Sequence, residues 1–148
     1  RDSFLEKSKK IKIKNNIFID RSLSNFMHSQ IINLEETKNL LKEQNFDIVK
    51  LENLSFDEQI YVFSNAKIVI GAHGAGLTNL CFSKEKTRVI EIRSSEPGYG
   101  FQNNVYERIS EINNLNYSLL STPYLSKKNI NGDLFVDLKV LNDQLKDI

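Results

Sequence analysis

The groups with the most chemical potential lie together in residues 67–79, which read KIVIGAHGAGLTN. Residues 68–70 are apolar and predict a buried strand, and residues 71–76 predict a glycine-rich turn that leads into a helical segment. Glycines let the backbone approach an anion closely, and the N–H groups of the turn and of the following helix then point at it. His73, inside the turn, adds an imidazole that can be neutral or charged near neutral pH. The stretch therefore predicts a phosphate-binding site.

The spacing of these glycines, G-x-x-G-x-G, matches neither of two familiar phosphate-binding patterns. The dinucleotide fingerprint is G-x-G-x-x-G, and a Walker loop ends in Gly-Lys-Ser or Gly-Lys-Thr, which the chain lacks. From the residues alone, a structural turn with a buried, hydrogen-bonded His73 explains the stretch equally well. Thr78 and Asn79 share this ambiguity, because each could donate to a phosphate or cap the segment that follows.

The elements around the turn alternate between strand and helix about five times. This alternation predicts an α/β fold of Rossmann-like type, with a parallel sheet and helices on both faces. The apolar run of residues 68–70 predicts that its strand is central. The expected strands are residues 16–20, 46–51, 67–71, 88–92, 117–120 and 134–136, and the expected helices are residues 34–44, 56–65, 102–112 and 138–146.

The ends and faces of these helices also follow from spacing. The expected N-caps are Asn33, Ser55 and Asp137, and Ser55 opens a capping-box pattern, S-x-x-E. Two helices carry apolar side chains spaced for one face, and we expect those faces to cover the sheet. The side chains are Phe56, Ile60 and Phe63 in one helix and Val105, Ile109 and Ile112 in the other.

Polar residues follow several of the strands, and ligands of parallel sheets bind beyond the carboxyl ends of strands. That rule places Asp20, Arg21, the glycine turn and the loop after Glu91 on one rim. Arg21 could bind a phosphate through two N–H groups, or form a salt bridge with Asp20 or a helix acid. Glu91 could accept hydrogen bonds from a ribose, or be an exposed strand-end charge. Glu96, in the loop, is a candidate for acid–base catalysis.

Composition narrows the possible partners. The 148 residues suit one domain, and a net charge of +1 leaves no positive excess for non-specific binding of nucleic acid. Cys81 is the only cysteine, and the only histidines are His28 and His73, so we expect no metal site. The chain has no D-x-D pair to hold a metal-bridged diphosphate. No apolar run approaches the roughly 18 residues of a membrane span.

Two runs carry a resemblance to a known family. Residues 56–79, FDEQIYVFSNAKIVIGAHGAGLTN, followed by VIEI at residues 89–92, closely resemble glycosyltransferase family 61. That family includes bacterial capsular polysaccharide enzymes and eukaryotic transferases of protein O- and N-glycans. The likeness extends more loosely over residues 17–147, and HGAGLTN is its most specific part.

The resemblance implies the carboxyl-terminal, donor-binding half of a two-domain transferase of GT-B type. Residues 1–15 would be a linker and residues 16–148 the domain, while a missing amino-terminal half would mainly hold the acceptor. It also implies an inverting, metal-independent transfer from a nucleotide-sugar to a polysaccharide or glycan, without a cofactor.

Site residues follow from this resemblance together with the strand-end rule. The turn of residues 73–76 and Arg21 would meet the donor diphosphate, and Glu91 the nucleoside. The motif does not identify a catalytic base, for which His73 and Glu96 are candidates. The expected donor-binding residues are Arg21, Gly71, His73, Gly74, Ala75, Gly76, Thr78, Asn79 and Glu91.

Two other functions remain open at this point. One is a hydrolase in which His73 activates a water, which requires an acidic partner near His73. The other is a nucleotide-binding module without catalysis of its own. Because the chain begins with Arg1, we expect a piece of a longer protein that is inactive without the rest. Asn, Lys and Ile supply 48 of the 148 residues, which indicates an AT-rich coding sequence and favours a cytoplasmic bacterial protein, membrane-associated through partners if at all.

Overall fold

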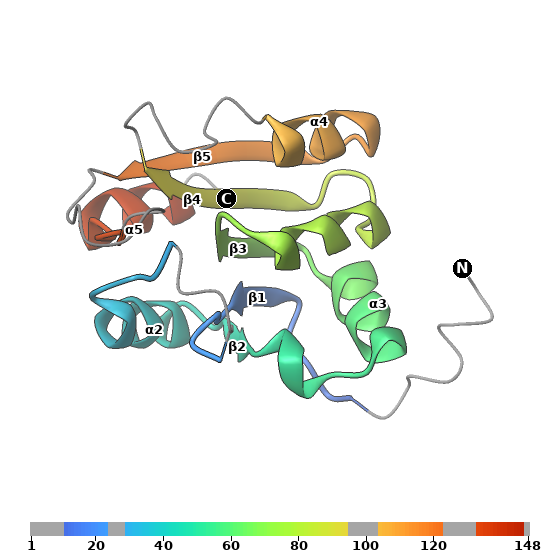
Figure 1. Cartoon of the computed structure of the whole chain (residues 1–148), viewed down its shortest axis with the longest axis horizontal. Coiled ribbons are helices and arrows are strands. Elements are labelled where there is room, and N and C mark those ends of the chain that lie inside the picture. Colours follow the sequence, from blue (N-terminus) through green and yellow to red (C-terminus); the bar gives the residue numbers. More distant parts are fainter. Residues whose placement is uncertain (1–10, 24–28, 95–103, 123–132, 147–148) are drawn as a thin grey trace.

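The computed structural model describes residues 11–23, 29–94, 104–122 and 133–146, which form one five-stranded sheet covered by helices (Figure 1). The strands are β1 (Asn16–Ile19), β2 (Asp47–Val49), β3 (Ile68–Ala72), β4 (Arg88–Ser94) and β5 (Asn116–Thr122). The α-helices are α2 (Leu34–Glu43), α3 (Phe56–Asn65), α4 (Val105–Ile112) and α5 (Leu138–Lys146), and the 3₁₀ helices are η1 (Leu51–Asn53) and η2 (Ala75–Phe82). His28, Glu96 and most of the predicted linker lie outside the described residues.

The strand order is β2-β1-β3-β4-β5, and all neighbouring strands are parallel. The chain passes from β1 outward to β2, returns to β3 on the other side of β1, and continues through β4 to β5. The winding therefore reverses between β1 and β3, and doubly wound sheets bind ligands beyond the strand ends at such a reversal. The predicted parallel sheet and the central place of β3 are confirmed, and every residue of β3 is buried.

Helices cover both faces of the sheet, as predicted. Helices α2 and α5 lie together on one side in Figure 1, and α3, η2 and α4 lie on the other. Alternate residues of each strand supply the two cores: Ile17 and Val69 face α3 and η2, whereas Phe18 and Ile70 face α2 and α5. Burial on both faces explains why β3 is a continuous apolar run rather than an alternating one.

Two of the three predicted N-caps are confirmed. The Ser55 hydroxyl accepts a hydrogen bond from the backbone N–H of Glu58, whose carboxylate accepts one from the N–H of Ser55 at 2.7 Å. Asp137 accepts from the backbone N–H groups of Lys139 and Val140. The prediction for Asn33 is wrong, because its side chain does not cap α2.

Asn33 instead binds a distant segment. Its amide nitrogen donates to the Val136 carbonyl at 2.9 Å, and its amide oxygen accepts from the Val136 N–H at 3.0 Å. The same segment forms an isolated parallel bridge between Ile31 and Leu134. Residues 134–136 are therefore tied to the start of α2 and do not form the predicted strand.

The helical segment after the glycine turn is the 3₁₀ helix η2. The N–H of Leu77 donates to the carbonyl of Gly74, three residues earlier. Leu77 and Leu80 are both fully buried, and a spacing of three places both on the sheet side of a helix with three residues per turn. Gly71 permits this close approach, since a β-carbon there would lie 3.2 Å from Leu77.

The predicted apolar faces of two helices are partly wrong. Ile60 and Phe63 are buried as expected, but Phe56 is 58% exposed and meets Phe82 edge to face. Ile112 of α4 is 80% exposed. The buried face of α4 carries Tyr106 and Ser110 instead, with Val105 exposed and Ile109 half-buried. Within the described residues, no helix is long and apolar enough to cross a bilayer.

Candidate functional site

The winding reversal brings together two residues that the sequence separates by 52 positions. Arg21 follows the end of β1, and His73 follows the end of β3. Nη1 of Arg21 donates a hydrogen bond to the backbone carbonyl of His73. The expectation that both residues lie on the rim with the glycine turn is confirmed, while their assignment to a phosphate remains a prediction.

Gly74 is required by this contact. Its backbone, at φ +156° and ψ 170°, occupies a region that essentially only glycine adopts. A β-carbon there would lie 2.8 Å from Nη2 of Arg21 and closer still to Cζ. The room that the missing side chain leaves is therefore filled by the guanidinium, whereas the sequence interpretation left it for a diphosphate.

Glu91 lies beneath the turn and is 1% exposed. Its Oε1 is 2.5 Å from Nδ1 of His73, and its Oε2 accepts a hydrogen bond from the Tyr117 hydroxyl, also at 2.5 Å. Both carboxylate oxygens thus have partners, which allows a charge to be buried in the sheet. The exposed strand-end charge considered above is wrong, and an acid this deeply buried suits holding His73 better than meeting a ribose.

Two tyrosines complete this cluster. Burial raises the pKa of Tyr117 well above its ordinary value, and the hydrogen bond to the Glu91 carboxylate raises it further. Burial also raises the pKa of Tyr106, against the opposing effect of its hydrogen bond with Thr78. The Tyr106 ring meets the His73 ring edge to face, with centroids 5.2 Å apart. Both phenols therefore keep their protons at neutral pH, and Tyr117 acts as a fixed donor to Glu91.

Arg21 supplies the positive charge of the rim. Burial lowers its pKa, and the neighbouring ionisable groups of Tyr106 and Glu52 act in the opposite direction. A guanidinium stays protonated in proteins despite such shifts, so this part of the rim remains cationic.

Asp20 points to the other face of the sheet and is 1% exposed. Its carboxylate forms ion pairs with Lys38, at 2.9 Å, and with Lys50, at 3.9 Å. Burial raises the pKa of Asp20, but the hydrogen bonds from Lys38 and from Ser22 outweigh it and hold the pKa below its usual value. Asp20 therefore anchors α2 and the end of β2 to the end of β1.

The remaining predicted donor-binding residues lie in different surroundings. Ala75 and Thr78 are exposed on η2. Gly76 packs under η1, since a β-carbon there would lie 3.0 Å from Leu51. The Asn79 amide donates to Gln59 of α3 at 2.9 Å, which directs it away from the turn.

Sequence reasoning missed Tyr106 and Tyr117. Both meet the site only through the pairing of β4 with β5 and the packing of α4, and no motif marks either contact. One signal was available: an acid flanked by two isoleucines in a central strand needs a donor from a neighbouring element.

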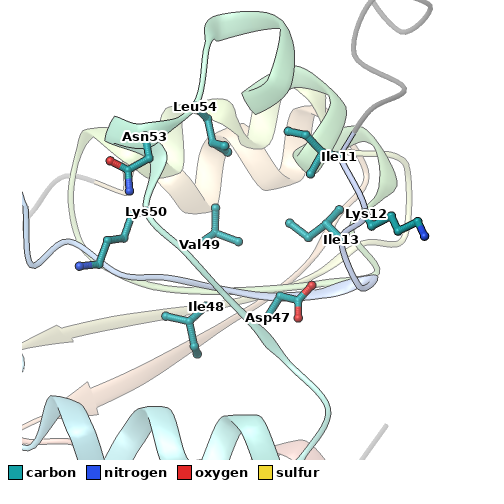
Figure 2. A pocket seen from close by; sticks show the side chains of 9 residues that line it. All are labelled: Ile11, Lys12, Ile13, Asp47, Ile48, Val49, Lys50, Asn53 and Leu54. Atoms are coloured by element: carbon teal, nitrogen blue, oxygen red, sulfur yellow. The ribbon is translucent and has the colours of Figure 1, made fainter.

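The larger hollows of the described structure lie elsewhere. One hollow of about 410 Å³ lies at the β2 edge. Figure 2 shows the side chains of Val49, Leu54 and Ile13 turned into it and Ile48 on the opposite side of the strand. None of the predicted donor-binding residues lines it. A small hollow lined by Arg21 and Ala72 lies at the reversal and has room for about one water. We place the site at the reversal, because the charged and hydrogen-bonding groups converge there.

Comparison with known proteins decides the family. Residues 2–90 match the model of the family described as Glycosyltransferase 61. The chain belongs to glycosyltransferase family 61. The family resemblance stated from the sequence is thereby confirmed.

Three characterised relatives share part of this family 61 chain. A β-1,2-xylosyltransferase of Arabidopsis thaliana is 36% identical over 67 residues, which is 45% of the chain and 12% of the relative. A β-1,2-xylosyltransferase of Oryza sativa subsp. japonica is 35% identical over 71 residues, 48% of the chain and 13% of the relative. An EGF domain-specific O-linked N-acetylglucosamine transferase of Gallus gallus is 36% identical over 74 residues, 47% of the chain and 14% of the relative. The chain thus matches only about an eighth of the length of these eukaryotic proteins.

Proposed function

We propose that this domain binds the nucleotide-sugar donor of a glycosyltransferase, with the donor diphosphate on the rim beyond the ends of β1 and β3. The observation that carries the proposal is the meeting of Arg21 and His73 across the winding reversal, at a glycine turn. Family membership and the three relatives named as transferases support it. The cationic guanidinium and the first N–H groups of η2 suit a diphosphate.

The transfer we propose is inverting and metal-independent. An acceptor hydroxyl attacks the anomeric carbon and gives its proton to a general base, the bond to the diphosphate breaks, and the diphosphate leaves with the bonding electrons. With no D-x-D pair in the sequence, Arg21, His73 and backbone N–H groups would balance the charge that develops on the leaving group. Positioning the two reactants contributes the rest.

The acceptor and the second domain belong to the same proposal. A GT-B arrangement would place the acceptor, a glycan or polysaccharide, on a domain outside this chain. The relatives are named for transfer of xylose and N-acetylglucosamine, so donors of these two sugars are the first to test.

One observation favours a second function. The hydrolase alternative requires an acidic partner at His73, and Glu91 lies 2.5 Å from Nδ1. Such a pair can activate a water to attack the sugar in place of an acceptor. Release of free sugar at the same rate with and without acceptor would favour the hydrolase, whereas product that forms only with acceptor favours the transferase.

The direct test is calorimetric titration of this chain with nucleoside diphosphates, nucleoside monophosphates and nucleosides. We expect diphosphates to bind most tightly, and a diphosphate at 100 times its Kd to stabilise the fold by about 2.7 kcal/mol. Turnover is expected from a longer chain that includes the acceptor domain. Failure of a folded chain to bind any diphosphate would overturn the proposal.

A further inference from the structure

Contacts from three neighbouring elements hold His73. Its N–H donates to the Ile92 carbonyl at 2.9 Å, and its own carbonyl accepts from Arg21. Its ring nitrogen Nδ1 meets Glu91, and its ring lies against Tyr106. Contacts from β1, β4 and α4 thus fix both the backbone and the ring of one residue, which is more than a structural turn requires.

We propose that Glu91 and Tyr117 are positioning residues that hold His73 with its hydrogen on Nδ1 and present Nε2 to the leaving diphosphate of the donor. The identity of the ligand rests on the proposed function, whereas the state of the imidazole does not.

The hydrogen-bond partners indicate which atom carries each proton. Tyr117 keeps its phenolic proton and donates it to Oε2 of Glu91, so this carboxylate is held as an acceptor. With Glu91 ionised, Oε1 has no proton to give and accepts a hydrogen bond from Nδ1–H of His73. The carboxylate–histidine arrangement sets the tautomer, because the hydrogen bond at one ring nitrogen decides the state of the other. Any contact of the ring with a ligand oxygen therefore has to go through Nε2.

The same arrangement links diphosphate binding to the uptake of a proton by the His73 ring. In the neutral ring with hydrogen on Nδ1, Nε2 carries a lone pair, which repels a phosphate oxygen. Protonation of Nε2 by the solvent turns it into a charged donor, and the Glu91 carboxylate balances the imidazolium. In the described part of the chain, the ionisable groups facing His73 from neighbouring elements are Arg21 after β1, Glu91 on β4 and Tyr106 on α4, and Tyr117 on β5 acts through Glu91. We expect proton uptake when a diphosphate binds at a pH where the free ring is neutral.

The first experiment observes the imidazole directly. The variant His28→Gln leaves His73 as the only histidine, so ¹⁵N spectra of its ring report one residue. We expect the Nδ1–H form in this background, and loss of that preference in Glu91→Gln. Tyr117→Phe keeps the carboxylate and is expected to weaken the preference, while Tyr61→Phe, on α3, is the matched control. An Nε2–H form in the parent, or an unchanged tautomer in Glu91→Gln, overturns the inference.

The second experiment measures nucleoside diphosphate affinity by calorimetry in buffers of different ionisation enthalpy. We expect the parent to take up a fraction of a proton, and Glu91→Gln to bind roughly tenfold more weakly, the loss of one hydrogen bond to a charged group. The double variant with His73→Ala should bind no more weakly than His73→Ala alone, because Glu91 acts through His73. Additive losses would overturn the inference.

The two experiments separate the inference from the proposed function. If the parent binds no diphosphate but shows the Nδ1–H form that Glu91→Gln abolishes, the proposed function fails and the positioning role stands. If the parent binds diphosphate and Glu91→Gln binds equally well, the positioning role fails and the function stands. Should Glu91→Gln not fold, Glu91→Asp and Tyr117→Phe provide the same comparison with a carboxylate in place.

Discussion

The guanidinium of Arg21 occupies the space in which a β-carbon of residue 74 would lie, so Arg21 and Gly74 fit together across the reversal between β1 and β3. The two strands meet here with a charged side chain from one resting on the bare backbone of the other. A cation is thereby fixed at the place where a doubly wound sheet binds its ligand.

The first prediction concerns Gly74. Gly74→Ala should destabilise the fold by about 1–3 kcal/mol, because the backbone conformation disfavours any side chain and the methyl group displaces Arg21. The affinity of the variant for diphosphate should also fall. Urea unfolding and calorimetry measure the two effects.

Gly76→Ala is the matched control for this prediction. Its added methyl group would lie close only to the end of the Leu51 side chain, which can move, and at an ordinary contact distance from Ile19, so a smaller loss is expected. Adding Arg21→Ala to Gly74→Ala should recover part of the stability by removing the steric conflict. Equal stability of the two glycine variants would contradict the fit of Arg21 to Gly74.

The second prediction concerns the charge of Arg21. Arg21→Ala should weaken diphosphate binding by about 1.5–3 kcal/mol and leave nucleoside binding nearly unchanged, because the guanidinium is assigned to the phosphates. Arg21→Lys should bind diphosphate more weakly than the parent and more tightly than Arg21→Ala, since lysine keeps the charge but lacks the paired N–H groups. The control is Arg108→Ala, which removes an exposed arginine from α4. If nucleoside and diphosphate binding weaken equally, Arg21 does not bind the phosphates.

Features with local signals were predictable from the sequence. The apolar run of β3 and the glycines after it lie within a few residues of one another, and the Ser55 capping box spans four residues. In each case the residues that form the feature are close together in the chain, so their spacing alone identifies the feature. The alternation of these local elements then predicts the parallel sheet, and the ends of β1 and β3 place Arg21 beside His73.

Features that depend on long-range pairing could not be predicted. The partner of Asn33 is 103 residues away, and Glu91 meets Tyr117 only because β4 pairs with β5. The buried face of α4 is another such case, because Tyr106 fills the space beside His73 and rotates the buried stripe by one residue. Helical spacing permits several apolar faces, and tertiary packing chooses among them.

The third prediction tests the long-range contact of Asn33. Asn33→Ala leaves a buried N–H and a buried carbonyl of Val136 without these partners, so the free energy of unfolding should fall by about 1–3 kcal/mol. Asn65→Ala is the control, because the Asn65 amide donates a local hydrogen bond, to the Tyr61 carbonyl four residues earlier. Chemical denaturation of both variants gives the comparison. Equal losses would mean that the segment after residue 133 is not held by Asn33.

The last prediction compares two ion pairs of equal length and unequal burial. Lys38 lies 2.9 Å from Asp20, whose side chain is fully buried, and Lys146 lies 2.9 Å from Asp143, which is about half exposed. Asp20→Asn should lower the free energy of unfolding at pH 7 by about 3 kcal/mol, because it leaves the largely buried Lys38 without its buried partner. Asp143→Asn should change nothing measurable, since solvent screens an exposed pair.

The pH dependence distinguishes this pair from a simple packing effect. The pKa of Asp20 is lowered in the fold, so its carboxylate stabilises the protein fully above the ordinary aspartate pKa of 3.8 and loses that contribution as the pH falls through the lower folded value. The difference in stability between the parent and Asp20→Asn should therefore be largest at neutral pH and shrink below about pH 4. Unfolding by urea across this range measures it. A difference that stays constant down to the acid limit would show that Asp20 stabilises the fold through packing and not through its charge.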